Sequence, residues 1–349
     1  MTERIGIVCN VFGQAGGMER YALDMISYLI SDGIEPVIFT KKEEKTIREE
    51  FPVEVHVCNM QLVPKIFEEI YFSHWLRTQL DACELLGVIG CCRNACSDIL
   101  ICGGTHRGFC HSMRRNKFKD RVISKFEQYA FERAKIIVAH SKLMRQELVS
   151  YYGIDEKKVE VLYPPVNDKR FRTVDPRERN FLRERLGMED GRKYFILPSS
   201  DHKRKGVHLI SRIFERTSLP VSLLVFGKKE KDMINVKYMG RTNEIEKYYQ
   251  AGDCTILASE YEPFGLVGVE SVLCGTSVLF PKNIGCTEVI KSPAWIEFDL
   301  KDERTLENAI GRIVNGQKHN FEPSHVISYD YSTRNHFSTL IDLLRQNKK

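Results

Sequence analysis

Short β-rich runs alternate with helical stripes along this sequence, and that alternation limits the folds open to the chain. The first run, Arg4–Cys9, is followed by a loop with three glycines. Apolar residues then recur at the i, i+3, i+4, i+7 spacing of a helix buried on one face: Met18, Tyr21, Ala22, Met25, Ile26, Leu29 and Ile30. Asp32-Gly33 ends this helix, and Pro36–Phe39 is the next expected strand. This order predicts a βαβ unit and a parallel sheet.

The same pattern returns in the middle of the chain. Helices are expected from Val207 and within Pro263–Cys274, between strands at Tyr194–Leu197, Val221–Phe226, Cys254–Ala258 and Ser277–Phe280. Two such series predict an α/β protein with two doubly wound domains, whose binding loops follow the carboxyl ends of the strands. The length of 349 residues agrees, because one domain usually takes about 150.

A pair of prolines marks the expected domain boundary. Proline continues neither a helix nor a central strand, and Pro164 and Pro165 lie side by side in the segment YPPVN. We therefore expect an N-terminal domain over residues 1–165, a C-terminal domain over 166–330, and a helix over 331–349 that joins the first domain and ends in a basic stretch.

The composition and the lack of certain segments exclude several classes of protein. With 42% hydrophobic and 28% charged residues the chain is globular rather than disordered. It lacks the run of about 20 apolar residues that a membrane span needs, and its N-terminus does not resemble a signal peptide. Eleven irregularly spaced cysteines then indicate reduced thiols and a cytoplasmic location. The net charge of +5 permits an anionic substrate or a membrane surface.

The first candidate site is the glycine loop before the first helix. Gly16 and Gly17 let a ligand approach the backbone, and the N–H groups of the first helical turn favour an anion. A tight turn without function would use the same residues. The spacing is neither that of a P-loop nor the G-x-G-x-x-G of a dinucleotide site, which disfavours a dehydrogenase.

The second candidate is the basic loop Asp201–Gly206, between a strand and a helix. Arg204 and Lys205 would each give a bound phosphate a charge-assisted bond worth about 1.5–3 kcal/mol. A solvated basic turn is the alternative, and the position after a central strand favours phosphate binding.

The third candidate is the segment EPFGLVGVE, which carries Glu262 and Glu270. With a helix beginning near Phe264, Glu270 is expected about two turns in, on the face toward the sheet. A buried carboxylate needs partners, and the paired hydroxyls of a ribose would supply them. A solvated Glu270 is the alternative, which its apolar neighbours disfavour: Val267, Val269, Val272 and Leu273.

The fourth candidate is His106, after the expected strand Ile99–Cys102. Functional groups of α/β proteins often follow such strands, although a histidine in a surface loop would look the same. Downstream, residues 107–125 hold seven lysines and arginines against one acid, Asp120. This excess of positive charge suggests contact with acidic lipid or a phosphorylated acceptor. The alternative is a run of charges that is merely solvated.

Metal binding is disfavoured. Several cysteines and histidines lie close in sequence, yet they form no C-x-x-C pair, and Cys102 occupies an apolar strand where a small hydrophobic residue is expected. The chain also has no D-x-D pair to anchor a metal on a diphosphate. Phosphate charge would then be neutralised by Arg204, Lys205 and helix N-termini.

Together these segments resemble a retaining glycosyltransferase of family 4, which has the GT-B architecture of two Rossmann-like domains facing across a cleft. The resemblance covers nearly the whole chain. It includes the glycine loop, Phe131-Glu132-Arg133-Ala134 before the strand Ile136–Ala139, the basic loop, Gly240-Arg241 and, most specifically, EPFGLVGVE. The segments GGTHR, FERA and SDHKRKG look most similar to bacterial α-glucosyltransferases of the lipopolysaccharide core.

The resemblance implies a role for each matching residue. Gly16 and Gly17 would lie against the donor diphosphate, which Arg204 and Lys205 would hold while stabilising the leaving nucleotide. Glu270 would bind the ribose hydroxyls, Glu262 the hydroxyls of the transferred sugar, and His106 would lie near its reacting face. The other expected donor contacts are Arg241, Phe264, Gly265 and Leu266. Many members of the family carry an arginine where this chain has Pro198-Ser199-Ser200. Arg204 would therefore supply more of the positive charge that holds the diphosphate.

The implied function is a metal-independent hexosyl transfer, with retention, from a nucleotide-diphosphate sugar, UDP first, to a membrane-associated glycan. The N-terminal domain would bind the acceptor, and residues 107–125 would meet the inner membrane surface. An epimerase or phosphorylase, or a sugar-binding subunit without activity, remains as an alternative on the same fold. The basic segment argues against an epimerase or phosphorylase, which acts on small molecules alone. A chemically competent residue at every expected site position argues against the inactive subunit. Nucleic acid is not an expected partner, because the basic charge is not interleaved with aromatic residues.

Overall fold

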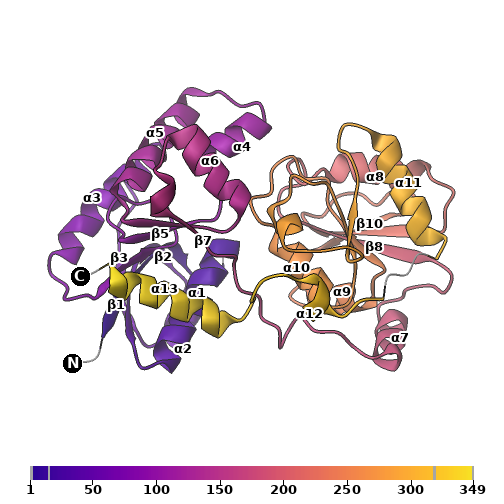
Figure 1. The fold of residues 1–349 in the computed structure, drawn as a ribbon, viewed down its shortest axis with the longest axis horizontal. Coiled ribbons are helices and arrows are strands. Elements are labelled where there is room, and N and C mark those ends of the chain that lie inside the picture. Colours follow the sequence, from indigo (N-terminus) through magenta and orange to yellow (C-terminus); the bar gives the residue numbers. More distant parts are fainter. Residues whose placement is uncertain (1–2, 15, 317–319, 348–349) are drawn as a thin grey trace. The chain divides into compact units, whose positions relative to one another are not determined.

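The computed structural model describes residues 3–14, 16–316 and 320–347, which fold into two compact α/β units (Figure 1). The first unit comprises Met1–Pro164 and Ser332–Lys349, and the second comprises Pro165–Tyr331. Each unit is built on one parallel sheet with helices on both faces. This architecture confirms the predicted fold class. Within the described ranges, none of the helices has both the length and the apolar character needed to cross a bilayer.

The sheet of the first unit has seven strands in the order β3-β2-β1-β4-β5-β6-β7. The strands are β1 (Arg4–Phe12), β2 (Glu35–Glu43), β3 (Glu54–Val57), β4 (Gly87–Gly90), β5 (Ile99–Cys102), β6 (Ile136–Ala139) and β7 (Val159–Val161). The chain builds outward from β1 to β3 and then continues on the other side of β1 with β4. Ligands of α/β proteins bind where the strand order reverses in this way, so the topology favours the loops after β1 and β4 as the binding edge of this unit.

Alternation along β1 explains how both faces of this sheet are covered. Ile5, Ile7 and Cys9 point into a core that also contains α1, and Val8 points into a second core on the opposite face. The helices are α1 (Gly17–Ser31), α2 (Lys45–Glu50), α3 (Glu68–Leu80), α4 (His106–Ser112), α5 (Phe118–Arg133), α6 (Lys142–Tyr152) and α13 (Thr333–Gln346), with a 3-10 turn η1 (Glu156–Lys158).

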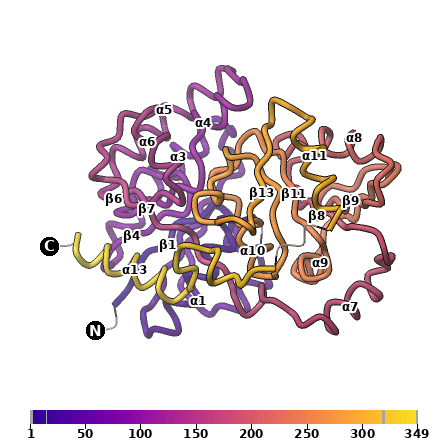
Figure 2. Tube along the Cα trace, turned by 45° about the vertical axis from the view of Figure 1, so that its right-hand side comes forward, coloured from indigo at the N-terminus to yellow at the C-terminus, as the bar shows by residue number. Residues whose placement is uncertain are grey.

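The helix α13 is the last element of the chain, and it belongs to the first unit. It lies beside α1 in both views (Figures 1 and 2), and its residues Phe337, Leu340 and Leu344 are buried in the core that α1 covers. The predicted C-terminal helix is therefore present. Lys348 and Lys349, the end of the predicted basic stretch, lie outside the described residues.

The sheet of the second unit has six strands in the order β10-β9-β8-β11-β12-β13, so its order reverses between β8 and β11. The strands are β8 (Lys193–Ser199), β9 (Val221–Gly227), β10 (Val236–Gly240), β11 (Cys254–Ile256), β12 (Val278–Phe280) and β13 (Trp295–Glu297). The helices are α7 (Pro176–Arg185), α8 (Val207–Arg216), α9 (Ile245–Ala251), α10 (Leu266–Leu273), α11 (Glu303–Val314) and α12 (Pro323–Val326), with a 3-10 turn η2 (Gly285–Glu288).

Candidate functional site

The two loops at the strand-order reversal of the second unit lie side by side. β8 pairs with β11 in parallel, so both strands end at the same edge of the sheet. Backbone hydrogen bonds join the loops that follow: the N–H of Ala258 donates to the carbonyl of Lys205 at 3.3 Å, and that of Glu260 to the carbonyl of Arg204 at 3.0 Å. The basic loop and the segment leading to Glu262 therefore form one structural element, although they are more than fifty residues apart in sequence.

This close approach requires a glycine at the start of α8. Gly206 has φ +67°, in the left-handed region, and a Cβ atom there would overlap the carbonyl oxygen of Ala258. Any larger residue would push the two loops apart. Gly206 thus explains why the basic loop ends where it does, and why the side chain of Lys205 is held in a buried position.

Arg204, Lys205 and Glu262 form a buried charge cluster between these loops. The carboxylate Oε2 of Glu262 lies 2.9 Å from Nη1 of Arg204 and 3.5 Å from Nζ of Lys205, and the three side chains are 13%, 17% and 8% exposed. Arg204 Nη1 also donates to the carbonyl of Tyr261 at 2.7 Å. Burial favours the protonated form of Glu262, but the charges of Lys205 and Arg204 outweigh it and hold the pKa of this carboxyl below its usual value. The charges of these three side chains sum to +1.

Two helix N-termini border the charge cluster. Within the described residues, no side chain caps the N-terminus of α8 or α10, so no capping side chain accepts a hydrogen bond from the N–H groups of their first turns. Such N–H groups favour an anion. Combined with the net positive charge of Arg204, Lys205 and Glu262, they give this edge of the sheet the chemistry to hold an anion.

The loop before α10 is fixed by the 3-10 turn η2. The N–H of Gly285 donates to the carbonyl of Glu262 at 3.1 Å, and that of Cys286 to the carbonyl of Phe264 at 2.6 Å. Phe264 and Gly265 are buried, and Leu266 is half-buried as the first residue of α10. These contacts hold the backbone of the predicted donor-binding segment in one conformation.

The structure corrects the predicted position of Glu270. The helix was expected to begin near Phe264, but Gly265 has φ +85°, which is not helical, so α10 begins at Leu266. Glu270 therefore lies about one turn into the helix rather than two. Its side chain is half-buried.

Sequence reasoning gave no role to His202, which the structure places in the middle of the basic loop. Its Nδ1 accepts from the hydroxyl of Ser199 at 2.8 Å, and its Nε2 donates to the carbonyl of Lys228 at 2.9 Å. A carbonyl only accepts, so Nε2 carries the proton. The buried imidazole thus ties the ends of β8 and β9 together.

Arg241 does not join this cluster. It is exposed and follows β10, the edge strand, which is separated from β8 by β9. Of the residues predicted in the second unit, the structure brings together Arg204, Lys205 and Glu262 with the Phe264–Leu266 segment, and it leaves Arg241 at the periphery.

In the first unit, Gly16 and Gly17 lie at the start of α1, directly after β1 and beside the strand-order reversal. Gly16 has φ −169°, an extended conformation open to any residue, and a Cβ atom there would approach the flexible carboxylate of Glu19, at 2.8 Å, which can move away. A Cβ atom on Gly17 would meet no described atom within 4 Å. Backbone strain and packing therefore do not require these glycines. Exposed space next to the first turn of α1 agrees with a place for a ligand.

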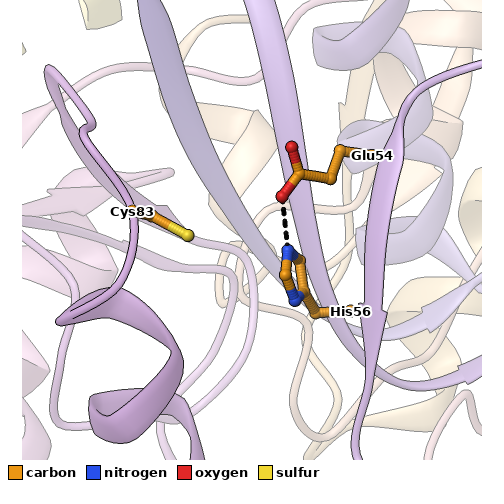
Figure 3. Close-up of side chains that lie close together, drawn as sticks. All are labelled: Glu54, His56 and Cys83. Atoms are coloured by element: carbon orange, nitrogen blue, oxygen red, sulfur yellow. Dashed lines mark hydrogen bonds and ion pairs between the residues drawn. The ribbon is translucent and has the colours of Figure 1, made fainter.

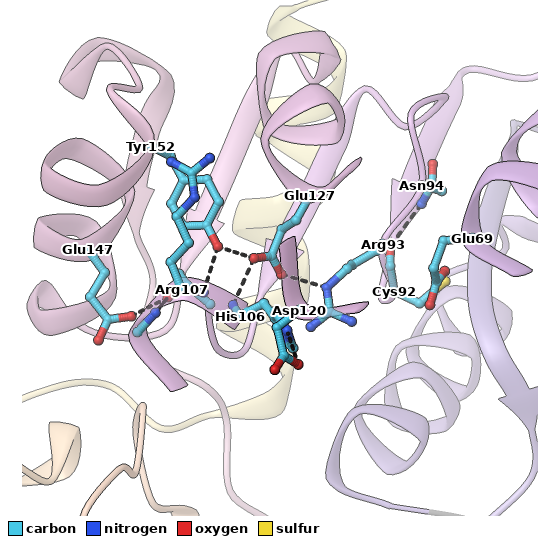
Figure 4. A network of polar contacts seen from close by, with 12 residues as sticks. Glu69, Cys92, Arg93, Asn94, His106, Arg107, Asp120, Glu127, Glu147 and Tyr152 are labelled. Carbon is cyan, nitrogen blue, oxygen red and sulfur yellow. Dashed lines mark hydrogen bonds and ion pairs between the residues drawn. The ribbon is translucent and has the colours of Figure 1, made fainter. Parts of the chain in front are cut away.

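His106 is part of a polar network that Figure 4 shows. The residue follows β5, which has the predicted bounds, and is the first of α4 after the capping Thr105. Its backbone N–H donates to Glu127 Oε2 at 2.7 Å, and its ring Nε2 lies 3.2 Å from Asp120 Oδ1. Burial, and after it the charge of Arg93, lower the pKa of His106, so the ring is neutral at pH 7. The imidazole is held in one orientation.

Arg93 and Tyr152 hold the centre of this network, and sequence reasoning found neither. Arg93 comes from the loop after β4, and its Nε donates to Glu127 Oε1 at 2.5 Å. The Tyr152 hydroxyl donates to the other oxygen of Glu127. Because the partners are 25 to 34 residues apart in sequence, no local pattern identifies them.

Two cations of the basic segment 107–125, Arg107 and Arg115, are half-buried and contact other residues of the first unit. Arg107 lies 4.3 Å over the ring of Tyr152 and donates to Gln128, and Arg115 pairs with the buried Asp120 at 3.1 Å. The cations that stay exposed surround Phe118, whose side chain is 76% exposed. They are Arg114, Lys117, Lys119, Arg121 and Lys125.

Comparison with protein families covers both units. Residues 15–170 match the family described as Glycosyltransferase Family 4, and residues 178–324 match the family described as Glycosyl transferases group 1. A "Probable transglycosylase" of Burkholderia thailandensis is 39% identical over 348 residues, which is 97% of this chain and 96% of that protein. Mannosylfructose-phosphate synthase of Agrobacterium fabrum is 24% identical over 46% of this chain and 40% of its own length.

Solved structures share the fold at low sequence identity. WaaG, described as a glycosyltransferase involved in lipopolysaccharide biosynthesis, matches with a TM-score of 0.74 at 15% identity, covering 99% of this chain and 98% of its own. Anabaena Alr3699/HepE, solved in complex with UDP and glucose, matches with a TM-score of 0.65 at 16% identity, covering 99% and 98%. At these identities the likeness establishes the GT-B fold.

Proposed function

This chain is a glycosyltransferase that belongs to family 4, and from that premise we propose that it moves a hexose, with retention, from a UDP-sugar to a membrane-associated glycan such as the lipopolysaccharide core. The observation that carries the proposal is the buried cluster of Arg204, Lys205 and Glu262, with its surplus positive charge at the strand-order reversal. A nucleoside diphosphate matches this site in charge.

The donor's diphosphate is assigned to Arg204, Lys205 and the N-termini of α8 and α10. Breaking the bond between the anomeric carbon and the diphosphate oxygen adds negative charge to the leaving group, and fixed cations and N–H dipoles stabilise that charge. Because these groups supply the positive charge, we propose that no metal ion takes part. UDP in the HepE structure supports the choice of nucleotide only by analogy.

The two glutamates are assigned to hydroxyl groups. Glu270, half-buried one turn into α10, takes the ribose hydroxyls, and Glu262 takes hydroxyls of the transferred sugar while it holds the two cations in place. Gly16, Gly17 and His106 of the first unit are assigned to the donor as the family resemblance implies. The neutral ring of His106 would act there as a hydrogen-bonding group and not as a cation.

Retention is assigned to substitution on one face of the sugar. The attacking oxygen of the acceptor bonds to the anomeric carbon on the face from which the diphosphate leaves, and its proton passes to an oxygen of the leaving phosphate. A covalent route would need a free carboxylate nucleophile. Glu262 is a poor candidate, because its Oε2 already binds Arg204 and Lys205.

Thermal unfolding in the presence of different nucleotide sugars tests which donor binds and whether its binding needs a metal ion. We expect UDP-sugars, but not GDP- or ADP-sugars, to raise Tm in the presence of EDTA, since a ligand at 100 times its Kd adds about 2.7 kcal/mol. Glu270→Gln should weaken this shift, and Arg216→Ala, at the exposed far end of α8, should not. Loss of turnover in EDTA, at a temperature at which circular dichroism shows the protein to stay folded, would refute the metal-independent mechanism. Isomerised sugar in the absence of an acceptor would identify an epimerase instead.

The exposed cations around Phe118 are proposed as the contact with an anionic membrane surface. Each lysine or arginine near such a surface contributes about 1 kcal/mol, and an exposed aromatic ring enters the interface. We expect Lys117→Glu/Lys119→Glu to reduce binding to phosphatidylglycerol vesicles at least tenfold in a flotation assay. Lys231→Glu/Lys237→Glu, in the second unit, is the matched control. Equal binding of both variants would contradict this assignment.

A further inference from the structure

A second group of side chains, far in sequence from the donor loops, has the composition of a metal site. Glu54 and His56 are two residues apart on β3, so their side chains lie on the same face of this edge strand (Figure 3). Cys83 approaches them from the turn that follows α3. One carboxylate oxygen, one imidazole nitrogen and the thiol sulfur all lie within 4.8 Å of one another.

From this arrangement we propose that Glu54, His56 and Cys83 bind a zinc ion that fastens the edge strand β3 to the turn after α3. Oxygen, nitrogen and sulfur are the three donor types that zinc takes in proteins, at about 2.0–2.3 Å from the metal. Around one ion the donor atoms would stand somewhat closer together than 4.8 Å, a change that small rotations of exposed or half-buried side chains accommodate. Three protein ligands leave the fourth position to water.

The surroundings of the group favour ligation over a plain ion pair. Arg4 pairs with Oε2 of Glu54, while Oε1 points to His56 at 2.6 Å, so the oxygen nearest the imidazole is the one left for a metal. Ligating carboxylates usually have such an outer hydrogen-bond partner. His56 also stacks on Phe39, with ring centroids 5.0 Å apart, which fixes the plane of the imidazole.

Cys83 is the residue that an ion pair leaves unexplained. Glu54 and His56 satisfy each other, but within the described chain the thiol of Cys83 has no hydrogen-bond partner, although it faces them. Cys83 is partly buried and packs against a buried apolar cluster that includes Phe72 and Leu76 of α3. A soft sulfur ligand turned toward a carboxylate and an imidazole is accounted for when all three share one cation.

Cobalt(II) provides the test, because it replaces zinc and reports its ligands by absorption. Full-length protein, stripped with a chelator and dialysed, should bind one Co²⁺ with a sulfur-to-cobalt charge-transfer band in the near ultraviolet. Cys83→Ser should abolish the band and His56→Ala should weaken binding at least tenfold, whereas Cys96→Ser should leave both unchanged. Cys96 is a matched control, since its thiol is half-buried in the same unit and donates to the Ser73 carbonyl.

Zinc should compete the cobalt band away and raise Tm of the native protein, but not of Cys83→Ser. Absence of the band, or its persistence in Cys83→Ser, would overturn the proposal. Circular dichroism checks that each variant folds, and Glu54→Gln is the second variant should Cys83→Ser unfold. The readout is independent of sugar transfer, so this result and the result for the donor site cannot be confused.

Discussion

Replacing Lys205 with alanine is expected to lower kcat for sugar transfer by about 10²–10³-fold, the usual cost of losing one donor to a developing negative charge. The physical reason is charge. Glu262 cancels one of the two cations, so removing Lys205 takes the buried cluster from one surplus positive charge to none. Initial rates with saturating donor measure the effect, and UDP affinity should fall as well.

The neighbouring Lys203 provides the control, because it belongs to the same loop but is exposed. Lys203→Ala should keep nearly full activity, and Lys205→Met should reproduce the loss while preserving the packing of the buried stem. Adding Glu262→Gln to Lys205→Ala restores the surplus charge, so UDP affinity should partly recover while turnover stays low. Full activity in Lys205→Ala would refute the phosphate assignment.

Acidification below about pH 6.5 is expected to destabilise the first unit by about 4 kcal/mol at pH 5, through two buried histidines. Burial lowers the pKa of His140 to about 4 and that of His336 to about 3, from an ordinary value of 6.5. Between pH 6.5 and 4 the unfolded chain therefore binds more protons than the folded one. Stability is complete above pH 6.5 and is lost as the pH falls, by about 2 kcal/mol for each histidine at pH 5.

Urea unfolding at pH 7 and pH 5 measures this loss. Both histidines pack around Tyr21, whose hydroxyl lies 2.7 Å from His336 Nε2, at the junction of α1, α13 and the end of β6. His140→Phe should remove about half of the pH dependence, and His208→Gln, an exposed histidine of α8, should remove none. An unchanged slope in His140→Phe would show that another group titrates.

The sequence predicted the strands well where a short apolar run is buried on both faces. Ile99–Cys102 and Ile136–Ala139 have the bounds expected from their composition. β1 runs three residues beyond its predicted end, because Val11 and Phe12 pair with Lys42 and Glu43 of β2. A strand end depends on its neighbour's length, which composition does not record.

The candidate site was predicted in pieces. Each loop was identified from its own residues, but only the pairing of β8 with β11 shows that Arg204 and Glu262 share one cluster. The sequence did not identify His202 or Arg93 as structural residues of the site, because the partners Lys228 and Glu127 are 26 and 34 residues away in sequence. The sequence also did not show which cations of the basic segment are half-buried, because the ring under Arg107 belongs to Tyr152, 45 residues further along the chain.

The return of α13 to the first unit has a consequence for how the protein is made. Synthesis on the ribosome delivers residues 1–164 first, but Phe337, Leu340 and Leu344 must still arrive to complete that unit's core. The half that is translated earliest is therefore finished last. Until α13 has been translated, apolar surface on α1 stays uncovered and open to chaperones, and a stop codon before α13 would destabilise the N-terminal unit.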